Sequence, residues 1–214
     1  MRLEPDGLLS QSQWLDRWQD LHGGYDPRQG SASVRRWLAL VHVVARPLAR
    51  TGVHPDLLTL ASLLAAGAVL LTPSWAGVVL VLLAALIDGL DGCVAVLQQR
   101  TSRWGYLLDS VVDRCTDIVL ILAMLQLAAP PALGAGCGFA VLLLEYIRAR
   151  AGNAGSGEIT VVTVGERPTR VIVAVLALAT GLGEIALWVL TVLTGVAVGQ
   201  LLVALRRTWA GEPG

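Results

Sequence analysis

Five aspartates lie in two neighbouring segments of the sequence that are otherwise almost entirely apolar. Asp88 and Asp91 are three residues apart within LIDGLDGCVAVL, and Asp109, Asp113 and Asp117 follow at intervals of four residues. On a helix, spacings of three and four place side chains on one face. The loop between the two segments is short, so the helices must be antiparallel neighbours. We therefore predict that their acidic faces meet.

Carboxylates that face one another cannot all stay ionised unless cations lie between them. Either their pKa values rise well above the ordinary range, or divalent metal ions hold the group together. Sites made of carboxylate oxygens suit Mg²⁺ or Mn²⁺, and two such ions about 3.5 to 4 Å apart are common in phosphoryl chemistry. The spacing therefore predicts a site for two ions, Mg²⁺ or Mn²⁺.

Two other interpretations start from the same aspartates. Acidic side chains inside a membrane can form the cation or proton relay of a transporter, but a relay spreads through several helices and these carboxylates occupy two. Asp113 and Asp117 can also be structural ion-pair partners of Arg114 or another arginine. Gly92 and Gly105 favour a ligand site, because glycine bares the backbone beside the carboxylates.

The elements that must position the aspartates are membrane-spanning helices. Of 214 residues, 55% are hydrophobic and 15% are charged, and the mean hydropathy is +0.65. This composition is too apolar for a soluble domain. Six apolar runs are long enough, or nearly so, to cross a bilayer core of about 30 Å. We predict an all-α membrane protein with six transmembrane helices, at 57–72, 75–99, 104–129, 132–147, 171–183 and 185–205.

The placement of arginine predicts the orientation in the membrane. All 16 basic residues are arginine, and the breaks near residues 73, 130 and 182 contain none. By the positive-inside rule, both termini and the carboxylates lie on the cytoplasmic side. A lysine-free composition is typical of a GC-rich bacterial genome, so we expect a multi-pass protein of a bacterial cell membrane. The net charge of zero argues against nucleic acid as a partner.

The first 32 residues are polar and lack the apolar core of a signal peptide. Trp14, Trp18 and Leu21 recur there at helical spacing, and residues 33–50 mix arginine with apolar side chains. Both segments are typical of amphipathic helices on the cytoplasmic membrane surface. A disordered tail is the alternative for the first segment. We divide the chain into a cytoplasmic extension 1–32, a transmembrane domain 33–207 and a tail 208–214.

The spacing of the aspartates resembles the signature of the CDP-alcohol phosphatidyltransferases, D-x-x-D-G-x-x-A-R-x8-G-x-x-x-D-x-x-x-D. Seven of its eight fixed positions match; Val96 stands where the family has arginine. The segment HPDLLT, residues 54–59, is similar to the segment that begins the family's first transmembrane helix. The segments IRARAG, residues 147–152, and GERPTR, residues 165–170, resemble those of the family's actinobacterial branch, the phosphatidylinositol-phosphate synthases. The matching residues are Asp88, Asp91, Gly92, Ala95, Gly105, Asp109 and Asp113.

The resemblance implies a reaction of phospholipid biosynthesis: the phosphatidyl group of CDP-diacylglycerol passes to an alcohol and CMP is released. It also assigns roles. The implied metal ligands are Asp88, Asp91, Asp109 and Asp113, with Asp113 also the general base. The implied nucleotide contacts are Gly92, Ala95, Gly105 and Thr59.

The alcohol is expected to meet a basic site. Four arginines near the ends of the fourth and fifth runs form a group in which we expect no carboxylate. Such a group would suit a phosphorylated polyol such as inositol phosphate or glycerol 3-phosphate; ordinary positive-inside anchoring is the alternative. Arg100 is a candidate replacement for the arginine missing at Val96. The four are Arg148, Arg150, Arg167 and Arg170.

Val96 also leaves room for another interpretation: a family member with lost or altered activity that still binds the CDP-lipid. The family's members are usually homodimers. Gly134 and Gly138 form a G-x-x-x-G pair that fits either a dimer contact, which we favour, or close packing within the bundle. The expected partners are CDP-diacylglycerol, an alcohol or phosphorylated polyol, membrane lipids and a second copy of the chain.

Overall fold

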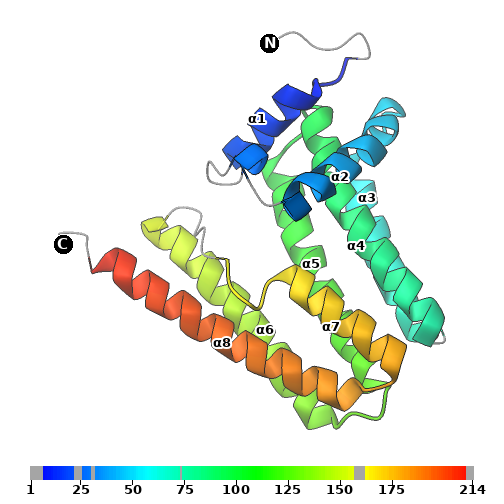
Figure 1. The fold of residues 1–214 in the computed structure, drawn as a ribbon, viewed down its shortest axis with the longest axis vertical. Helices are drawn as coiled ribbons and strands as arrows, with labels where there is room; N and C mark the ends of the chain where they lie inside the picture. Colours follow the sequence, from blue (N-terminus) through cyan, green and yellow to red (C-terminus); the bar gives the residue numbers. More distant parts are fainter. Residues whose placement is uncertain (1–6, 22–25, 30–31, 73, 157–161, 211–214) are drawn as a thin grey trace. The chain divides into compact units, whose positions relative to one another are not determined.

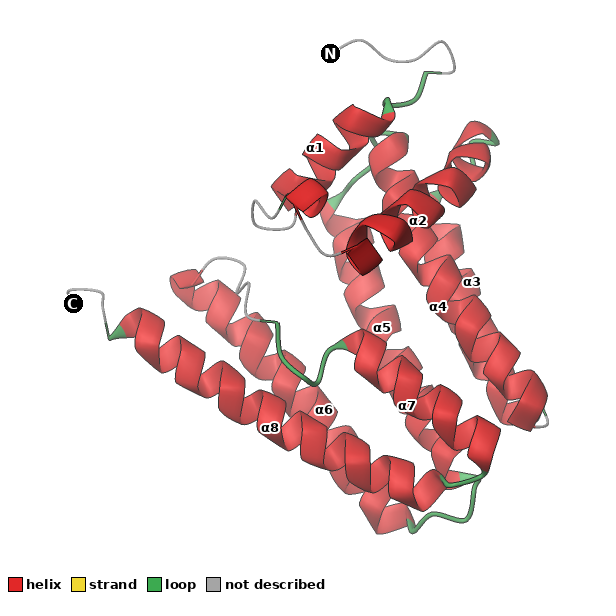
Figure 2. Cartoon of the chain, in the orientation of Figure 1, coloured by secondary structure: helices red, strands yellow, loops and turns green. Residues whose placement is uncertain are grey.

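The computed structural model describes residues 7–21, 26–29, 32–72, 74–156 and 162–210, and within these ranges every regular element is helical (Figure 2). This confirms the all-α expectation. Short 3₁₀ or π turns occupy Pro27–Gln29, Val69–Leu71 and Gly152–Ser156. The α-helices are α1 Gln11–Leu21, α2 Ala32–Arg50, α3 Pro55–Ala68, α4 Ser74–Leu97, α5 Arg103–Leu125, α6 Pro131–Ala151, α7 Arg167–Thr180 and α8 Gly183–Trp209 (Figure 1).

Three of the described helices are long and apolar enough to cross a membrane: α4, α6 extended to Ala154, and α8. A fourth span results if Leu38–Arg50 and Pro55–Leu71, which are bent by 119°, act as one. The predicted count of six is higher for two reasons. The aspartates and arginines of α5 lower its hydropathy, and α7 has 14 residues, short of the roughly 20 that a span needs. The count of six stays a prediction.

The chain forms two compact units, and α4 and α5 each contribute to both. Unit 1 comprises residues 1–65 and 83–113, and unit 2 comprises residues 66–82 and 114–214. The four aspartates of the motif therefore belong to unit 1. Asp117 belongs to unit 2.

The core of unit 1 includes the N-terminal segment. Trp14 is 1% exposed, and its ring centroid lies 5.1 Å from that of His42 on α2. The backbone N–H of Leu9 donates to the carbonyl of Leu97 at 3.3 Å, and the Arg46 guanidinium donates to the carbonyl of Leu9 at 3.5 Å. Residues 7–21 thus form a packed part of unit 1 that contains α1, and they are not a disordered tail. A surface location for α1 and α2 stays a prediction.

Unit 2 packs tightly where helices approach glycine. A Cβ atom on Gly134 would lie 2.6 Å from Leu125 Cδ1 on α5. Gly138 faces Ile121 of the same helix, at 3.8 Å. The Gly134–Gly138 pair therefore packs inside the chain, so our preference for a dimer contact at this pair was wrong. The second interpretation, close packing within the bundle, is the one observed.

The closest approach occurs at the start of α8, and it yields a prediction. A Cβ on Gly183 would lie 2.2 Å from the Met124 carbonyl oxygen and 2.6 Å from Leu127 Cβ. We expect Gly183→Ala to destabilise the fold by about 1 to 3 kcal/mol, because the methyl group meets backbone that cannot move aside alone. A lower thermal unfolding midpoint in detergent would show this.

Gly195→Ala is the matched control on the same helix. No heavy atom in the described part of the chain lies within 4 Å of its would-be Cβ. Since alanine favours helix over glycine by about 1 kcal/mol, this variant should keep or raise the midpoint. Equal midpoints for the two variants would contradict the close approach at Gly183.

Candidate functional site

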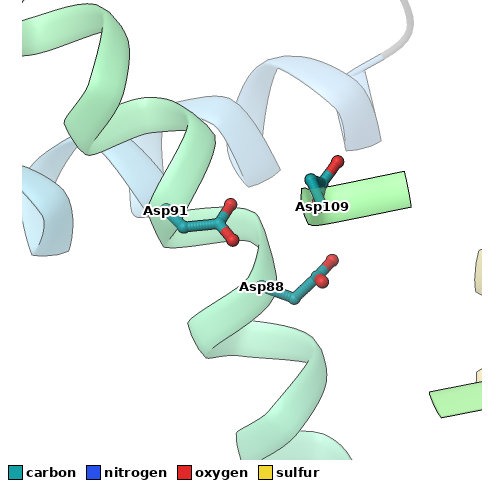
Figure 3. A group of neighbouring side chains, drawn as sticks. All are labelled: Asp88, Asp91 and Asp109. Atoms are coloured by element: carbon teal, nitrogen blue, oxygen red, sulfur yellow. The ribbon is translucent and has the colours of Figure 1, made fainter. Parts of the chain in front are cut away.

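Three carboxylates meet in unit 1. Asp88 and Asp91 project from α4 on the side where Asp109 of α5 lies (Figure 3). One oxygen from each lies within 4.8 Å of the others. Asp91 is buried, whereas Asp88 and Asp109 are half-buried, so the group can be reached from outside the core. The two acidic faces therefore meet as their spacing predicts.

Asp91 is held on both of its oxygens. The Thr59 hydroxyl on α3 donates to Oδ2 at 2.5 Å, and the backbone N–H of Gly92 donates to Oδ1 at 2.5 Å. Thr59 and Asp91 are 4% and 5% exposed. A buried carboxylate is costly without such donors, and charge-assisted hydrogen bonds are short and strong. Thr59 thus orients Asp91; its contact with a nucleotide stays a prediction.

Asp113 lies one helical turn beyond Asp109 on α5 and is half-buried. Four residues rise about 6 Å along a helix and return to nearly the same face. Asp113 is not one of the three carboxylates that lie within 4.8 Å of one another. It is therefore placed beside the group of three on the helix that carries Asp109. Its roles as metal ligand and general base stay predictions.

The small residues of the motif differ in their surroundings. Gly92 is exposed, and no heavy atom of the described residues lies within 4 Å of its would-be Cβ. A Cβ on Gly105 would lie 3.3 Å from Ser102 Oγ and 3.6 Å from Asp56 Oδ1. Ala95 is half-buried. Open backbone at Gly92 is what a closely approaching ligand needs, and the nucleotide contacts stay predictions.

The departure from the motif at Val96 has a structural reason. Val96 is 5% exposed and belongs to an apolar cluster with Leu9 of the N-terminal segment. An arginine here would bring a charge into that cluster. Arg100, the predicted replacement, is exposed and donates at 3.4 Å to the carbonyl of Gly52 and to Gln98 Oε1.

Unit 2 holds a second charged group, which pairs two arginines with two carboxylates. Arg170 is 3% exposed and donates to Asp117, to Glu145 and, through Nε at 3.0 Å, to the carbonyl of Gly165. Arg114 lies 3.2 Å from Asp117 and 2.9 Å from Glu145. Asp117 is therefore a structural ion-pair partner, as the alternative interpretation held.

Arg148 is held by a neighbouring carboxylate. Its guanidinium donates to the two oxygens of Glu166 at 2.9 and 2.8 Å, and the backbone N–H of Thr163 donates to Glu166 Oε1 at 2.8 Å. Burial by itself would raise the pKa of Glu166, but these hydrogen bonds outweigh it and lower the pKa to about 2. Glu166 thus stays ionised near neutral pH and fixes Arg148 beside the start of α7.

The expectation that no carboxylate lies among the predicted acceptor arginines is therefore wrong. Glu145 and Glu166 both contact members of the group. Both glutamates stand near arginines in the sequence, but Glu145 contacts Arg170, 25 residues away, and Glu166 contacts Arg148, 18 residues away, so their spacing along the chain did not indicate these pairs. Arg150 is exposed and Arg167 is half-buried, so these two are more accessible than the buried Arg170.

Comparison with known proteins agrees with the geometry. The model of the CDP-alcohol phosphatidyltransferase family matches residues 52–205. The chain belongs to this family. The phosphatidylinositol phosphate synthase of Mycolicibacterium smegmatis is 32% identical, covering 80% of this chain and 86% of the relative. That of Corynebacterium glutamicum is 36% identical, covering 77% of this chain and 83% of the relative. The resemblance found in the sequence is confirmed.

Solved structures of the family share the fold. A crystal structure of Mycobacterium tuberculosis phosphatidylinositol phosphate synthase with CDP-DAG bound is similar at a TM-score of 0.64 and 26% identity, covering 78% of this chain and 94% of that one. A second structure of that enzyme, in complex with manganese and citrate, has a TM-score of 0.63 and 26% identity, covering 78% and 88%. The structures of this phospholipid-synthesis enzyme are thus similar in fold to this chain over most of its length.

The bond between Thr59 and Asp91 leads to a prediction. Thr59→Val keeps the shape of the side chain and removes the donor, so Asp91 loses a partner that orients it. Such partners of site carboxylates typically change metal affinity or activity about 10- to 100-fold. We expect a loss of this size in the apparent affinity for Mn²⁺, measured by metal titration of the detergent-solubilised protein.

Thr116→Val is the matched control. Thr116 is buried in unit 2, and its hydroxyl has no hydrogen-bond partner among the described residues. This variant should bind Mn²⁺ as the wild type does. If Thr59→Val also kept the wild-type affinity, Asp91 would not depend on Thr59 for its orientation.

Proposed function

We propose that this protein transfers the phosphatidyl group of CDP-diacylglycerol to a phosphorylated polyol and releases CMP. One observation carries the proposal: Asp88, Asp91 and Asp109 have carboxylate oxygens within 4.8 Å of one another, at the motif positions of the family. The relatives named above support a polyol phosphate as acceptor, since they are phosphatidylinositol phosphate synthases.

The group of three suits a divalent metal ion. All of its donors are carboxylate oxygens, which Mg²⁺ and Mn²⁺ prefer over softer ligands. Asp88, Asp91 and Asp109 would hold a first ion, and Asp113 would complete the ligands of a second. When bound, such ions would neutralise the diphosphate and stabilise the charge that develops on the departing CMP.

Asp113 is the proposed general base. Its carboxylate would accept the proton of the acceptor hydroxyl, and the hydroxyl oxygen would form a bond to the phosphorus of the phosphatidyl group. The bond between that phosphorus and the oxygen of CMP breaks, so CMP leaves with the electron pair. Gly92, Ala95 and Gly105 would give the cytidine access to the helix backbone.

Among the predicted acceptor residues, Arg150 is the strongest candidate for binding a phosphate, because its side chain is exposed. Arg148 and Arg167 are half-buried, and Arg148 and Arg170 already donate to carboxylates. A guanidinium binds a phosphate through two parallel hydrogen bonds, which an acceptor without a phosphate cannot offer. Arg100 stays a weaker candidate because it contacts a backbone carbonyl.

The membrane arrangement belongs to the same proposal. We propose six spans in a bacterial cell membrane, with both termini and the carboxylates on the cytoplasmic side, and a homodimer. The three long apolar helices support the membrane location. Membership of the family counts against the transporter interpretation. A member with lost or altered activity is the alternative, and turnover decides between the two.

The deciding experiment measures CMP release by purified protein in detergent with CDP-diacylglycerol and Mg²⁺ or Mn²⁺. The acceptors are inositol 1-phosphate, glycerol 3-phosphate, inositol and serine. We expect CMP to appear with a phosphorylated polyol and not with inositol or serine. No CMP with any acceptor, from protein that still binds the CDP-lipid, would support the alternative of lost activity.

Asp113→Asn tests the general base. The amide keeps the size of the side chain but accepts no proton, so kcat should fall by about 10²- to 10⁴-fold while CDP-lipid binding persists. Asp26→Asn, a change of the same kind at a half-buried carboxylate paired with Arg28, is the control and should keep the wild-type rate. A wild-type rate in Asp113→Asn would remove Asp113 from this role.

A further inference from the structure

An aromatic pair in the core of unit 1 joins the N-terminal helix to α2. The rings of Trp14 on α1 and His42 on α2 have their centroids 5.1 Å apart, and their planes are tilted by 49°. Trp14 is 1% exposed and His42 is 6% exposed, so the contact is closed to water. A titratable side chain therefore lies buried in the interface that holds α1.

Each of the two rings has a buried nitrogen atom without a partner. Nε1 of Trp14 and Nε2 of His42 find no hydrogen-bond partner among the residues that the structure describes. A neutral imidazole can carry its proton on Nδ1, so that Nε2 is only an unused acceptor. A protonated imidazole has donors on both nitrogens, and Nε2 would then be a buried, charged donor with nothing to accept its proton. The interface accommodates the neutral ring and not the charged one.

The nearest charge favours the same form. Arg46 lies one helical turn beyond His42 on α2, and among the described residues it is the one charged side chain whose field acts on the imidazole. Its guanidinium donates to the carbonyl of Leu9 at 3.5 Å, which keeps the positive charge in the interface. A second positive charge on His42 would be repelled by it.

The other elements of unit 1 offer the imidazole no counter-ion. On α1, the side chains of Asp16, Arg17 and Asp20 are between 58% and 70% exposed, so water and salt screen them. The apolar cluster that contains Trp14 receives apolar side chains from α3 and α4, and Cys93 of α4 adds a thiol without charge. Protonation of His42 would therefore have no compensation within this core.

We propose that His42 makes the docking of α1 sensitive to pH: protonation of its imidazole releases Trp14 from the core, so α1 is docked at neutral pH and undocks in mild acid. A histidine in water gains its proton near its ordinary pKa of about 6.5, whereas the docked ring resists protonation. The undocked state thus binds more protons, and docking is complete above this pH and weakens as the pH falls below it. The inference goes beyond the proposed transferase function and does not depend on it.

Hydrogen exchange of the full-length protein in detergent measures the docking. A helix of 11 residues is marginal in water by itself, so the amides of α1 exchange when the helix undocks. At about pH 5.5, one unit below the ordinary pKa, a free imidazole is roughly 90% protonated. After correction for the intrinsic exchange rate, we expect the protection of α1 to fall about tenfold between about pH 7.5 and pH 5.5. The amides of α8, in unit 2, should keep their protection. Unchanged protection of α1 would overturn the proposal, and it would show that the indole face stabilises the imidazolium.

His42→Phe separates the titration from the packing. Phenylalanine keeps a planar ring against Trp14 but binds no proton, so the protection of α1 should be the same at both pH values. His42→Leu serves the same purpose if the larger ring does not fit. His54→Phe is the matched control, because His54 is 55% exposed beside Asp56 on another element and this variant should keep the tenfold response. If the variants at residue 42 lose protection in acid as the wild type does, another group is responsible and the proposal is wrong.

Discussion

An ionised carboxylate on an apolar helix needs a partner, because removing it from water costs several kcal/mol. This constraint acts twice along α5. In unit 2, Asp117 is matched by Arg114 and Arg170. In unit 1, Asp109 lies instead with the two aspartates of α4. The partners of each carboxylate, and not the residue type, decide what it can do.

The two groups differ in net charge, and this difference separates structure from chemistry. Two arginines balance two carboxylates in unit 2, so that group is neutral and gives a cation no advantage. Breaking such a pair is costly, which suits a group that ties α5, α6 and α7 together. Three carboxylates within 4.8 Å repel one another unless a cation joins them. The group in unit 1 thus has the chemistry that suits a divalent cation, as we propose, and Thr59 holds one of its members in place.

The spacing of the aspartates was enough to predict the site because helical periodicity is local. Asp88 and Asp91 share a face of α4 whatever the rest of the chain does. The partners of Arg148 and Arg170 depended on segments that meet only in the fold, so the sequence suggested free guanidinium groups where Glu166 and Glu145 pair with them. The count of six spans stays a prediction for a related reason: α5 carries charges whose place on the helix a count along the chain cannot give, so length and composition alone select three helices.

Val96 shows that a single position of a motif can be misinterpreted when it is considered without the fold. Considered alone, a valine in place of arginine suggests a lost contact. In the fold, Val96 belongs to the apolar cluster that receives Leu9 and Trp14, and full burial of a side chain of this size contributes about 1.5 to 3 kcal/mol to the stability of that cluster. In this chain the residue at the motif position therefore serves the docking of α1 onto α4, which the motif does not show when it is considered as a list of residue types.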